Sequence, residues 1–214
     1  MAPYKLSFIE MALKASALQF GEFTLKSGRI SPYFFNISTF CSGSQLTTVG
    51  QCYREAIKDS GIQFNGLFGP AYKGIPLAIS AACAYAEQGI DIPVSFNRKE
   101  PKNHGERGAL IGTELTGNIL AVDDVVTAGT AIRESVDFVE NHGARLVAFC
   151  VALDRQERAQ AGTFSALAEL TLKFGLQPVS IICLDDILEF ATKDSRIPKA
   201  IVGSIEAYRA DYGT

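Results

Sequence analysis

The segment Ile-Leu-Ala-Val-Asp-Asp-Val-Val-Thr-Ala-Gly-Thr-Ala, residues 119–131, decides the fold that we expect for this chain. Its first four residues are apolar and partly β-branched, which is typical of a strand buried on both faces. Two carboxylates and a hydroxyl-rich turn follow at once, and from Thr130 onward the pattern favours a helix. Open α/β sheets place ligands at such strand-to-helix turns. The segment therefore predicts a ligand site.

The turn at residues 127–130 and the two carboxylates before it suit different parts of one ligand. The backbone N–H groups of the turn, its hydroxyls and the helix N-terminus can bind an anion, while Asp123 and Asp124 suit ribose hydroxyls or a cation. The plainer alternative is a polar strand end in which Thr127 or Thr130 only caps the next helix. Taken together, these residues favour a ligand that carries a phosphate and a sugar.

The rest of the chain alternates between short apolar runs and helical patterns. We expect strands at residues 66–68, 93–96, 119–122, 145–153 and 179–184, and helices at residues 45–59, 75–87, 165–174 and from 186 onward. Such alternation predicts an α/β fold, with a mostly parallel central sheet flanked by helices.

The N-terminal part has a different pattern and is expected to form a small hood subdomain. Ser7 and Glu10 have the spacing of a capping box and predict a helix that ends near Gly21. Residues 22–25 and 31–37 are typical of a hairpin-like element. We therefore expect a single domain over residues 1–214, divided into a hood with helices at about 1–60, an α/β core at about 61–185 and C-terminal helices at about 186–214.

Composition excludes several classes of protein. The chain has 214 residues, 47% of them hydrophobic, and a net charge of −3, so a nucleic-acid partner is not expected. No apolar run is long enough to span a bilayer and no secretory signal is evident, which predicts a cytoplasmic protein without a membrane partner. The five cysteines are widely spaced without a CxxC pair, which favours free thiols over disulfides or zinc.

A second turn that suits a phosphate lies at residues 69–76. Its two glycines, Gly69 and Gly74, permit close backbone approach, and Lys73 can meet a phosphate. Alone, the segment indicates only a turn. Two such turns in one sheet, however, suit a ligand with a phosphate at one end and a diphosphate at the other.

The segment at residues 98–108 is basic and contains Pro and Gly but no apolar anchor. A charged run of this kind is by default a solvated surface loop. Beside a polyanion site, a mobile basic loop can instead close over a diphosphate and exclude water.

Segment 121–131 is similar at nearly every position to the phosphoribosyl diphosphate (PRPP) signature of the type I phosphoribosyltransferases. Across almost the whole chain, the sequence resembles the orotate phosphoribosyltransferase family, through Lys26, the run at 31–35, Tyr72 with Lys73, the loop at 98–108 and Arg155. The resemblance implies the type I phosphoribosyltransferase fold. It also implies magnesium-dependent transfer of ribose 5-phosphate from PRPP to orotate, giving orotidine 5′-monophosphate and diphosphate in pyrimidine biosynthesis.

The resemblance further implies roles for individual residues. The catalytic residues would be Lys102, His104, Asp123 and Asp124. The residues that bind PRPP would be Tyr72, Lys73, Arg98, Lys99, Lys102, His104, Asp123, Asp124, Val125, Val126, Thr127, Ala128, Gly129, Thr130 and Ala131. The residues that bind orotate would be Lys26, Phe34, Phe35, Thr127 and Arg155. Alternatives remain for two of these groups, because Phe34 and Phe35 could be core aromatics and Arg155 could form a surface ion pair with Asp154 or Glu157.

The same resemblance implies a cofactor and a partner. Mg²⁺ would be bound mainly through PRPP and water, so no dedicated protein metal ligands are expected. Family members are dimers in which the mobile loop of one subunit reaches the neighbouring site, and residues 98–108 would do so here. Pro101, Asn103 and Arg107 depart from residues often found in this loop, which would alter its flexibility or closing rate.

Two other functions stay open. One is a phosphoribosyltransferase for another base, against which Phe34, Phe35, Lys26 and Arg155 argue. The other is a regulatory protein that binds PRPP without catalysis, against which the basic loop and the absence of a strongly basic surface argue.

Overall fold

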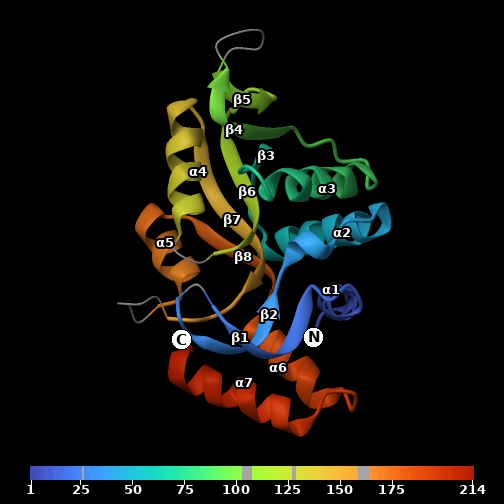
Figure 1. Ribbon diagram of the computed structural model, residues 1–214. Coiled ribbons are helices and arrows are strands. Elements are labelled where there is room, and N and C mark those ends of the chain that lie inside the picture. Colours follow the sequence, from blue (N-terminus) through green and yellow to red (C-terminus); the bar gives the residue numbers. More distant parts are fainter. Residues whose placement is uncertain (26, 103–107, 127–128, 159–163) are drawn as a thin grey trace.

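A six-stranded sheet forms the centre of the computed structural model, which describes residues 1–25, 27–102, 108–126, 129–158 and 164–214 (Figure 1). The strand order is β5-β4-β3-β6-β7-β8. The strands are β3 (Gly66–Gly69), β4 (Val94–Lys102), β5 (Gly108–Gly112), β6 (Asn118–Val125), β7 (Arg145–Asp154) and β8 (Gln177–Cys183). All neighbouring strands run parallel except β4 and β5. The predicted α/β fold with a mostly parallel sheet is confirmed.

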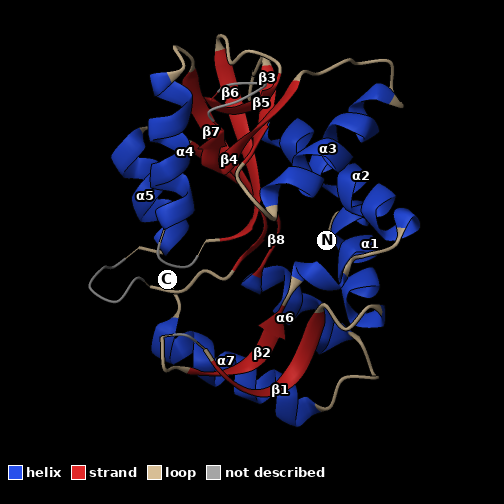
Figure 2. Cartoon of the chain, turned by 45° about the horizontal axis from the view of Figure 1, so that its top comes forward, coloured by secondary structure: helices blue, strands red, loops and turns tan. Residues whose placement is uncertain are grey.

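Helices cover both faces of this sheet (Figure 2). One face carries α2 (Gly43–Ser60) and α3 (Gly74–Ala86), and the other carries α4 (Thr130–Asn141) and α5 (Ala166–Phe174). Alternate residues of β6 enter different apolar clusters: Leu120 and Val122 pack on one side, Ile119 and Ala121 on the other. This alternation explains the unbroken apolar run at the start of the strand, because both of its faces are buried.

The N-terminal strands form a separate sheet. Strands β1 (Leu18–Thr24) and β2 (Ile30–Phe35) pair antiparallel, and a short 3₁₀ turn at Ile37–Thr39 leads from β2 to α2. The pair lies at the lower end of the molecule in Figure 1, with α6 (Leu184–Lys193) and α7 (Lys199–Tyr212). β2 also lies close to the end of β7, because Ser31 of β2 accepts a hydrogen bond from Arg155, the residue that follows β7.

The first helix differs from the prediction at both ends. Helix α1 (Pro3–Lys14) begins four residues before the expected cap at Ser7 and ends well before Gly21. Proline is favoured in the first turn of a helix, where its missing N–H costs nothing. Phe8 and Ile9, between the supposed cap residues, are fully buried in the middle of the helix. A capping box does occur at the start of α2. There the Ser42 hydroxyl accepts a hydrogen bond from the backbone N–H of Gln45, and the Gln45 side chain accepts one from the backbone N–H of Ser42.

The basic segment is also more regular than predicted. Residues 98–102 were expected in a loop but continue β4, and β5 was not expected at all. The two strands pair antiparallel, with Asn97 opposite Leu110 and Lys102 opposite Gly108. Backbone pairing along a sheet edge needs no apolar side chains, so the polar composition of residues 98–102 gave no sign that β4 continues, and β5 is too short to show a period. Residues 103–107, the remainder of the predicted loop, lie outside the described residues.

Among the helices in the described ranges, none combines the length and apolar character needed to cross a membrane.

Candidate active site

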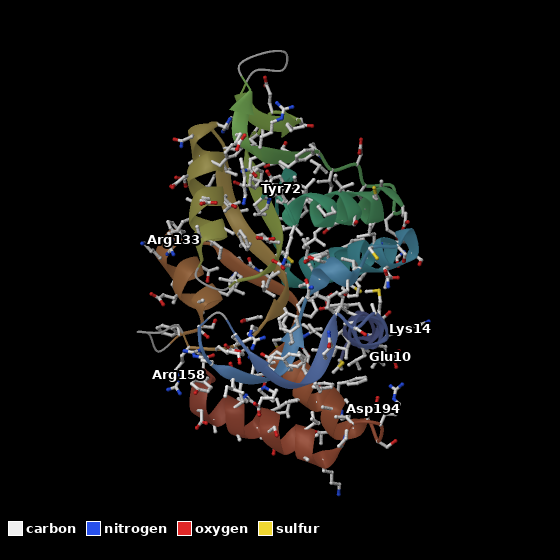
Figure 3. The ribbon with its side chains drawn as sticks, viewed as in Figure 1. Glu10, Lys14, Tyr72, Arg133, Arg158 and Asp194 are labelled. Carbon is white, nitrogen blue, oxygen red and sulfur yellow. The ribbon has the colours of Figure 1, made fainter. Side chains whose placement is uncertain are left out.

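The carboxyl ends of three neighbouring strands set the position of the site. Strands β3, β6 and β7 run parallel, so the segments that follow Gly69, Val125 and Asp154 leave the sheet at the same edge. Parallel sheets flanked by helices bind ligands at this edge. Tyr72, on the turn that follows β3, lies near the middle of the molecule (Figure 3).

A direct ion pair joins two of the predicted PRPP-binding segments. Lys73 Nζ lies 2.6 Å from Asp124 Oδ2. Lys73 precedes α3 and is exposed, whereas Asp124 lies near the end of β6 and is buried. The pair therefore places a cation and an anion together at the junction of two strand ends.

Asp123 is buried beside this pair. Its Oδ1 accepts a hydrogen bond of 2.9 Å from the backbone N–H of Asp124, and its carbonyl accepts one of 2.8 Å from the Tyr53 hydroxyl. Burial, and then the neighbouring charge of Asp124, raise the pKa of Asp123 to about 7. A carboxyl group with this pKa is able to hold or release a proton near neutral pH.

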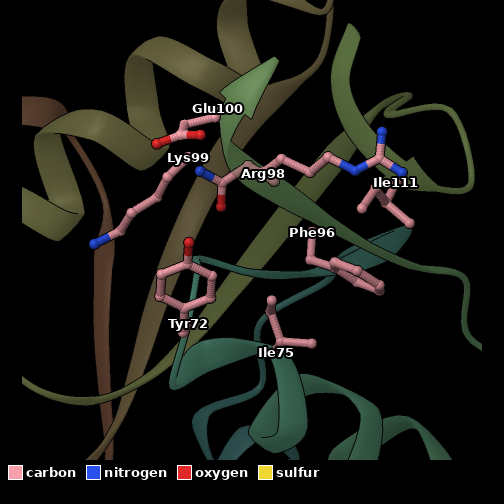
Figure 4. A pocket seen from close by; sticks show the side chains of 8 residues that line it. Tyr72, Ile75, Phe96, Arg98, Lys99, Glu100 and Ile111 are labelled. Atoms are coloured by element: carbon pink, nitrogen blue, oxygen red, sulfur yellow. The ribbon is translucent and has the colours of Figure 1, made fainter. Parts of the chain in front are cut away.

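The turn at residues 70–73 contacts β4. The backbone N–H of Ala71 donates a 2.8 Å hydrogen bond to Asn97 Oδ1, and Lys99 Nζ lies 5.1 Å from the centre of the Tyr72 ring. Beside the turn is a cavity of about 340 Å³ (Figure 4). The residues that line the cavity are Tyr72, Ile75, Phe96, Asn97, Arg98, Lys99, Glu100 and Ile111. Arg98 and Lys99 thus meet the Tyr72 turn from β4.

The start of α4 matches its prediction. The helix begins at Thr130, and Gly129 before it has φ +71°, a left-handed conformation that glycine adopts without steric cost. Thr130 is exposed at the helix N-terminus, where an anion is favoured. Val125, Val126 and Ala131 are half-buried beside it. The helix start can therefore take part in binding a phosphate.

Arg155 is tied to β2 and to its own segment. Its Nε donates a 2.7 Å hydrogen bond to Glu157 Oε1, and its Nη2 donates one of 3.0 Å to Ser31 Oγ. The guanidinium carbon lies 4.3 Å from the centre of the Tyr33 ring. The ion pair with Glu157 that the sequence left open as an alternative is present, but both side chains are only 13% exposed, so it is not a surface pair.

Phe34 and Phe35 point to opposite faces of β2, because successive side chains of a strand alternate. Phe34 is exposed and stacks on Phe23 with ring centres 5.4 Å apart. Phe35 is buried, with its ring centre 6.2 Å from that of Phe8. The geometry favours core packing for Phe35 and leaves Phe34 available to a ligand.

Several predicted site residues cannot be placed. Lys26, His104, Thr127 and Ala128 lie outside the described residues, and for Lys102 only the backbone is described, as the last residue of β4.

Four residues that support the site were not named as site residues from the sequence. They are Ser31, Tyr53, Asn97 and Glu157. Tyr53 and Asn97 are distant in sequence from the groups they hold, so no local pattern could have indicated them. Ser31 stood within the quoted run at 31–35, and Glu157 was named only as an ion-pair partner of Arg155.

Comparison with known proteins gives a consistent result. The family model described as "Phosphoribosyl transferase domain" matches residues 48–180. The chain is 51% identical to an orotate phosphoribosyltransferase of Pseudomonas aeruginosa over 214 residues, which is 100% of both chains. It is also similar to the crystal structure of orotate phosphoribosyltransferase from Francisella tularensis, with a TM-score of 0.88 and 38% identity over 97% of this chain and 100% of that one.

A more distant structure shares the fold. It is an orotate phosphoribosyltransferase of Mycobacterium tuberculosis in complex with PRPP, with a TM-score of 0.65 and 24% identity over 86% of this chain and 99% of that one.

Proposed function

The chain belongs to the orotate phosphoribosyltransferase family, and on this premise we propose how the residues at the carboxyl edge of its sheet carry out the reaction. The reaction transfers ribose 5-phosphate from PRPP to orotate and yields orotidine 5′-monophosphate and diphosphate, a step of pyrimidine biosynthesis. The observation that carries the assignment of residues is the 2.6 Å contact between Lys73 and Asp124, because it joins the two segments expected to bind the two ends of PRPP.

PRPP would lie across this edge with its two phosphate ends on different turns. The 5′-phosphate would be bound by the helix start, from Val125 and Val126 through Thr127, Ala128, Gly129, Thr130 and Ala131. The diphosphate would be bound by Tyr72 and Lys73 with the cations of β4, Arg98 and Lys99. Asp123 and Asp124, between these turns, would hold the ribose hydroxyls.

Catalysis would be mainly electrostatic. A ring nitrogen of orotate forms a bond to C1 of the ribose, while the bond from C1 to the diphosphate oxygen breaks and the diphosphate leaves with the electron pair. Lys102 and His104 would stabilise the negative charge that develops on the leaving group. Asp123 or Asp124 would hold or relay a proton, and the raised pKa of Asp123, caused by burial, supports this role.

Orotate would be recognised through its ring and its carboxylate. Arg155 would bind the carboxylate, because a guanidinium can hold it with two parallel hydrogen bonds. Phe34 would contact the ring from β2, which its exposure supports, and Phe35 would support β2 from the core. Lys26 and Thr127 would supply further polar contacts.

We propose Mg²⁺ as the cofactor, held mainly by the diphosphate and water. In the described part of the chain, no three acidic, histidine or cysteine side chains gather as metal ligands, but Asp123 and Asp124 offer carboxylate oxygens at the edge. This donor set fits an ion that keeps several waters and binds through substrate phosphates. When bound, Mg²⁺ would neutralise charge on the diphosphate.

The assembly and location are also proposals. We propose a homodimer in which the segment at residues 98–108, besides meeting Tyr72 of its own subunit through Arg98 and Lys99, also reaches the neighbouring site. We also propose a single domain with a hood and helices at about 1–60, a core at about 61–185 and C-terminal helices at about 186–214. We also propose that the protein works in the cytoplasm. Free thiols at Cys52 and Cys150 support a reducing compartment.

Rates with different bases test the specificity. We expect turnover of orotate with PRPP and Mg²⁺, and at most trace turnover of adenine, hypoxanthine or uracil under the same conditions. Preferred turnover of another base would contradict the proposal, as would tight PRPP binding without turnover of any base.

A further inference from the structure

Arg155 is held by the protein along one edge and on one face of its guanidinium. Its Nε donates to Glu157 Oε1 at 2.7 Å, and its Nη2 lies 2.6 Å from the same oxygen. Nη2 also donates to Ser31 Oγ at 3.0 Å, and the ring of Tyr33 covers one face at 4.3 Å. A guanidinium carries five N–H groups in a planar fork, so the Glu157 edge uses only part of its capacity. Among the described residues, the hydrogen bonds of Arg155 to Glu157 and Ser31 come from Nε and Nη2, and the buried hydroxyl of Tyr208 also faces this guanidinium.

Glu157 connects Arg155 to a second arginine. Its Oε2 lies 3.6 Å from Arg29 Nη1, and its Oε1 accepts a 3.4 Å hydrogen bond from the Tyr33 hydroxyl. The side chains of Arg29, Arg155 and Glu157 are 19%, 13% and 13% exposed. These three largely buried side chains, two guanidinium groups and one carboxylate, together carry one more positive than negative charge. A further carboxylate would balance this charge, because buried charges are stable only when paired.

The backbone that carries Glu157 is fixed independently of Arg155. Asp154 Oδ1 accepts a 2.9 Å hydrogen bond from the N–H of Gln156, a residue in the left-handed conformation with φ +50°. Glu157 itself forms an isolated β-bridge with Gly213, and the N–H of Arg158 donates to the carbonyl of Tyr212 at 2.8 Å. The backbone from which the Glu157 carboxylate projects is therefore set by the fold, so this side chain can support Arg155.

We propose that Glu157 is a positioning residue for the proposed orotate site: it holds the Nε edge of Arg155, so that the remaining N–H groups of the guanidinium are presented to the carboxylate of the base. This inference rests on the proposed contact between Arg155 and orotate. It assigns to Glu157 a part in selecting a base that carries a carboxylate over one that does not, although Glu157 does not touch the base.

Steady-state kinetics of the full chain test this role. We expect Glu157→Ala to raise the KM for orotate about tenfold or more, the scale of one lost charge-assisted hydrogen bond, with little change in the KM for PRPP. Glu157→Gln keeps a hydrogen-bond acceptor but loses the charge, so it should restore part of the affinity. The preference for orotate over uracil should fall in the order wild type, Gln variant, Ala variant. Glu206→Ala, on an exposed part of α7, is the matched control and should change none of these values.

Each outcome separates this inference from the function on which it rests. An unchanged KM for orotate in Glu157→Ala, or equal rises in both KM values with a lower melting temperature, would overturn the positioning role. If the Ala variant fails to fold, an unchanged KM in Glu157→Gln would overturn it instead. Arg155→Ala tests the underlying contact. If its KM for orotate is unchanged, the proposed orotate site itself is wrong. If that KM rises strongly while the KM of the Glu157 variants does not change, only the positioning role is wrong.

Discussion

Lys73 Nζ lies 2.6 Å from Asp124 Oδ2, so an ion pair connects the turn after β3 to the end of β6. These two segments are 51 residues apart in the sequence. The contact is possible because β3 and β6 are parallel neighbours in the sheet and end at the same edge. In the proposed function, bound PRPP would place its diphosphate near Lys73 and its ribose near Asp124, so the ion pair would lie where these two parts of the substrate meet.

Loss of the Lys73 ammonium should lower the catalytic efficiency with PRPP. We expect Lys73→Ala to reduce kcat/KM for PRPP roughly 100-fold, the scale seen when one well-placed electrostatic donor is removed from an active site. The measurement is the initial rate at varied PRPP and saturating orotate. Lys14→Ala is the control, because Lys14 is exposed at the end of α1 (Figure 3). Equal rates for both variants would show that Lys73 has no part in PRPP binding.

Asp123 should make stability depend on pH. Its pKa is raised from 3.8 to about 7, chiefly by burial, so between these values the folded chain binds a proton that the unfolded chain does not. The contribution of Asp123 to the free energy of unfolding should therefore fall as pH rises from about 4 to about 7, by about 1.4 kcal/mol for each pH unit within that interval.

Asp123→Asn cannot ionise and should lose this dependence. The stability of the variant minus that of the unmodified chain should therefore rise with pH and reach its largest value above about pH 7. Urea unfolding midpoints of both proteins at about pH 5 and about pH 8 check this. If the urea midpoints of the two proteins differ by the same amount at both pH values, the pKa of Asp123 is not raised by folding.

The two neighbouring phenylalanines of β2 should respond differently to truncation. Phe35→Ala removes a buried ring that packs on Phe8, and we expect it to cost about 3–5 kcal/mol of stability. Phe34→Ala removes an exposed ring and should change stability far less, but raise the KM for orotate. Thermal unfolding and kinetics of the two variants check both statements. A KM for orotate that is unchanged in Phe34→Ala would exclude that residue from the orotate site.

The first residue of α3 has no room for a side chain. A Cβ on Gly74 would lie 2.5 Å from Pro70 Cδ and 2.6 Å from the carbonyl oxygen of Val122, so Gly74→Ala must displace the 70–73 turn. We expect a loss of about 1–3 kcal/mol in stability and a higher KM for PRPP. Gly203→Ala is the control, since nothing lies within 4 Å of its added Cβ and alanine favours the α7 helix. If Gly74→Ala behaves like Gly203→Ala, the close packing of this turn does not matter for binding.

The sheet and its ligand edge could be predicted because their signals are local. The apolar run before Asp123 is continuous since both faces of β6 are buried, and the helix start at Thr130 follows a glycine that adopts the required turn. The hairpin of β4 and β5 could not be predicted in the same way. β4 is polar from Asn97 onward and shows no apolar period there, and β5 is only a five-residue Gly-Ala-Leu-Ile-Gly segment, so neither gives a local signal for the pairing.

The supporting residues of the site escaped prediction for a related reason. The Tyr53 hydroxyl contacts the carbonyl of Asp123 across 70 residues, and Asn97 contacts Ala71 across 26, so only the folded chain brings them together. The start of α1 was misplaced because Ser7 and Glu10 have the spacing of a cap, whereas Phe8 and Ile9 are buried within the helix that Pro3 begins. Local spacing cannot distinguish a cap from an interior turn of helix.

The loss of orotate absorbance in the presence of PRPP and Mg²⁺ is the most direct measurement. It should be followed for the unmodified chain, for Lys102→Ala and for Asp124→Ala, and also for the unmodified chain after Mg²⁺ has been removed with a chelator. We expect rapid loss with the unmodified chain, at least a roughly 100-fold slower loss with either variant, and none without the metal. Absence of any loss in a folded, unmodified chain that still binds PRPP would contradict the assignment of orotate as substrate, and full rates in both variants would contradict the site.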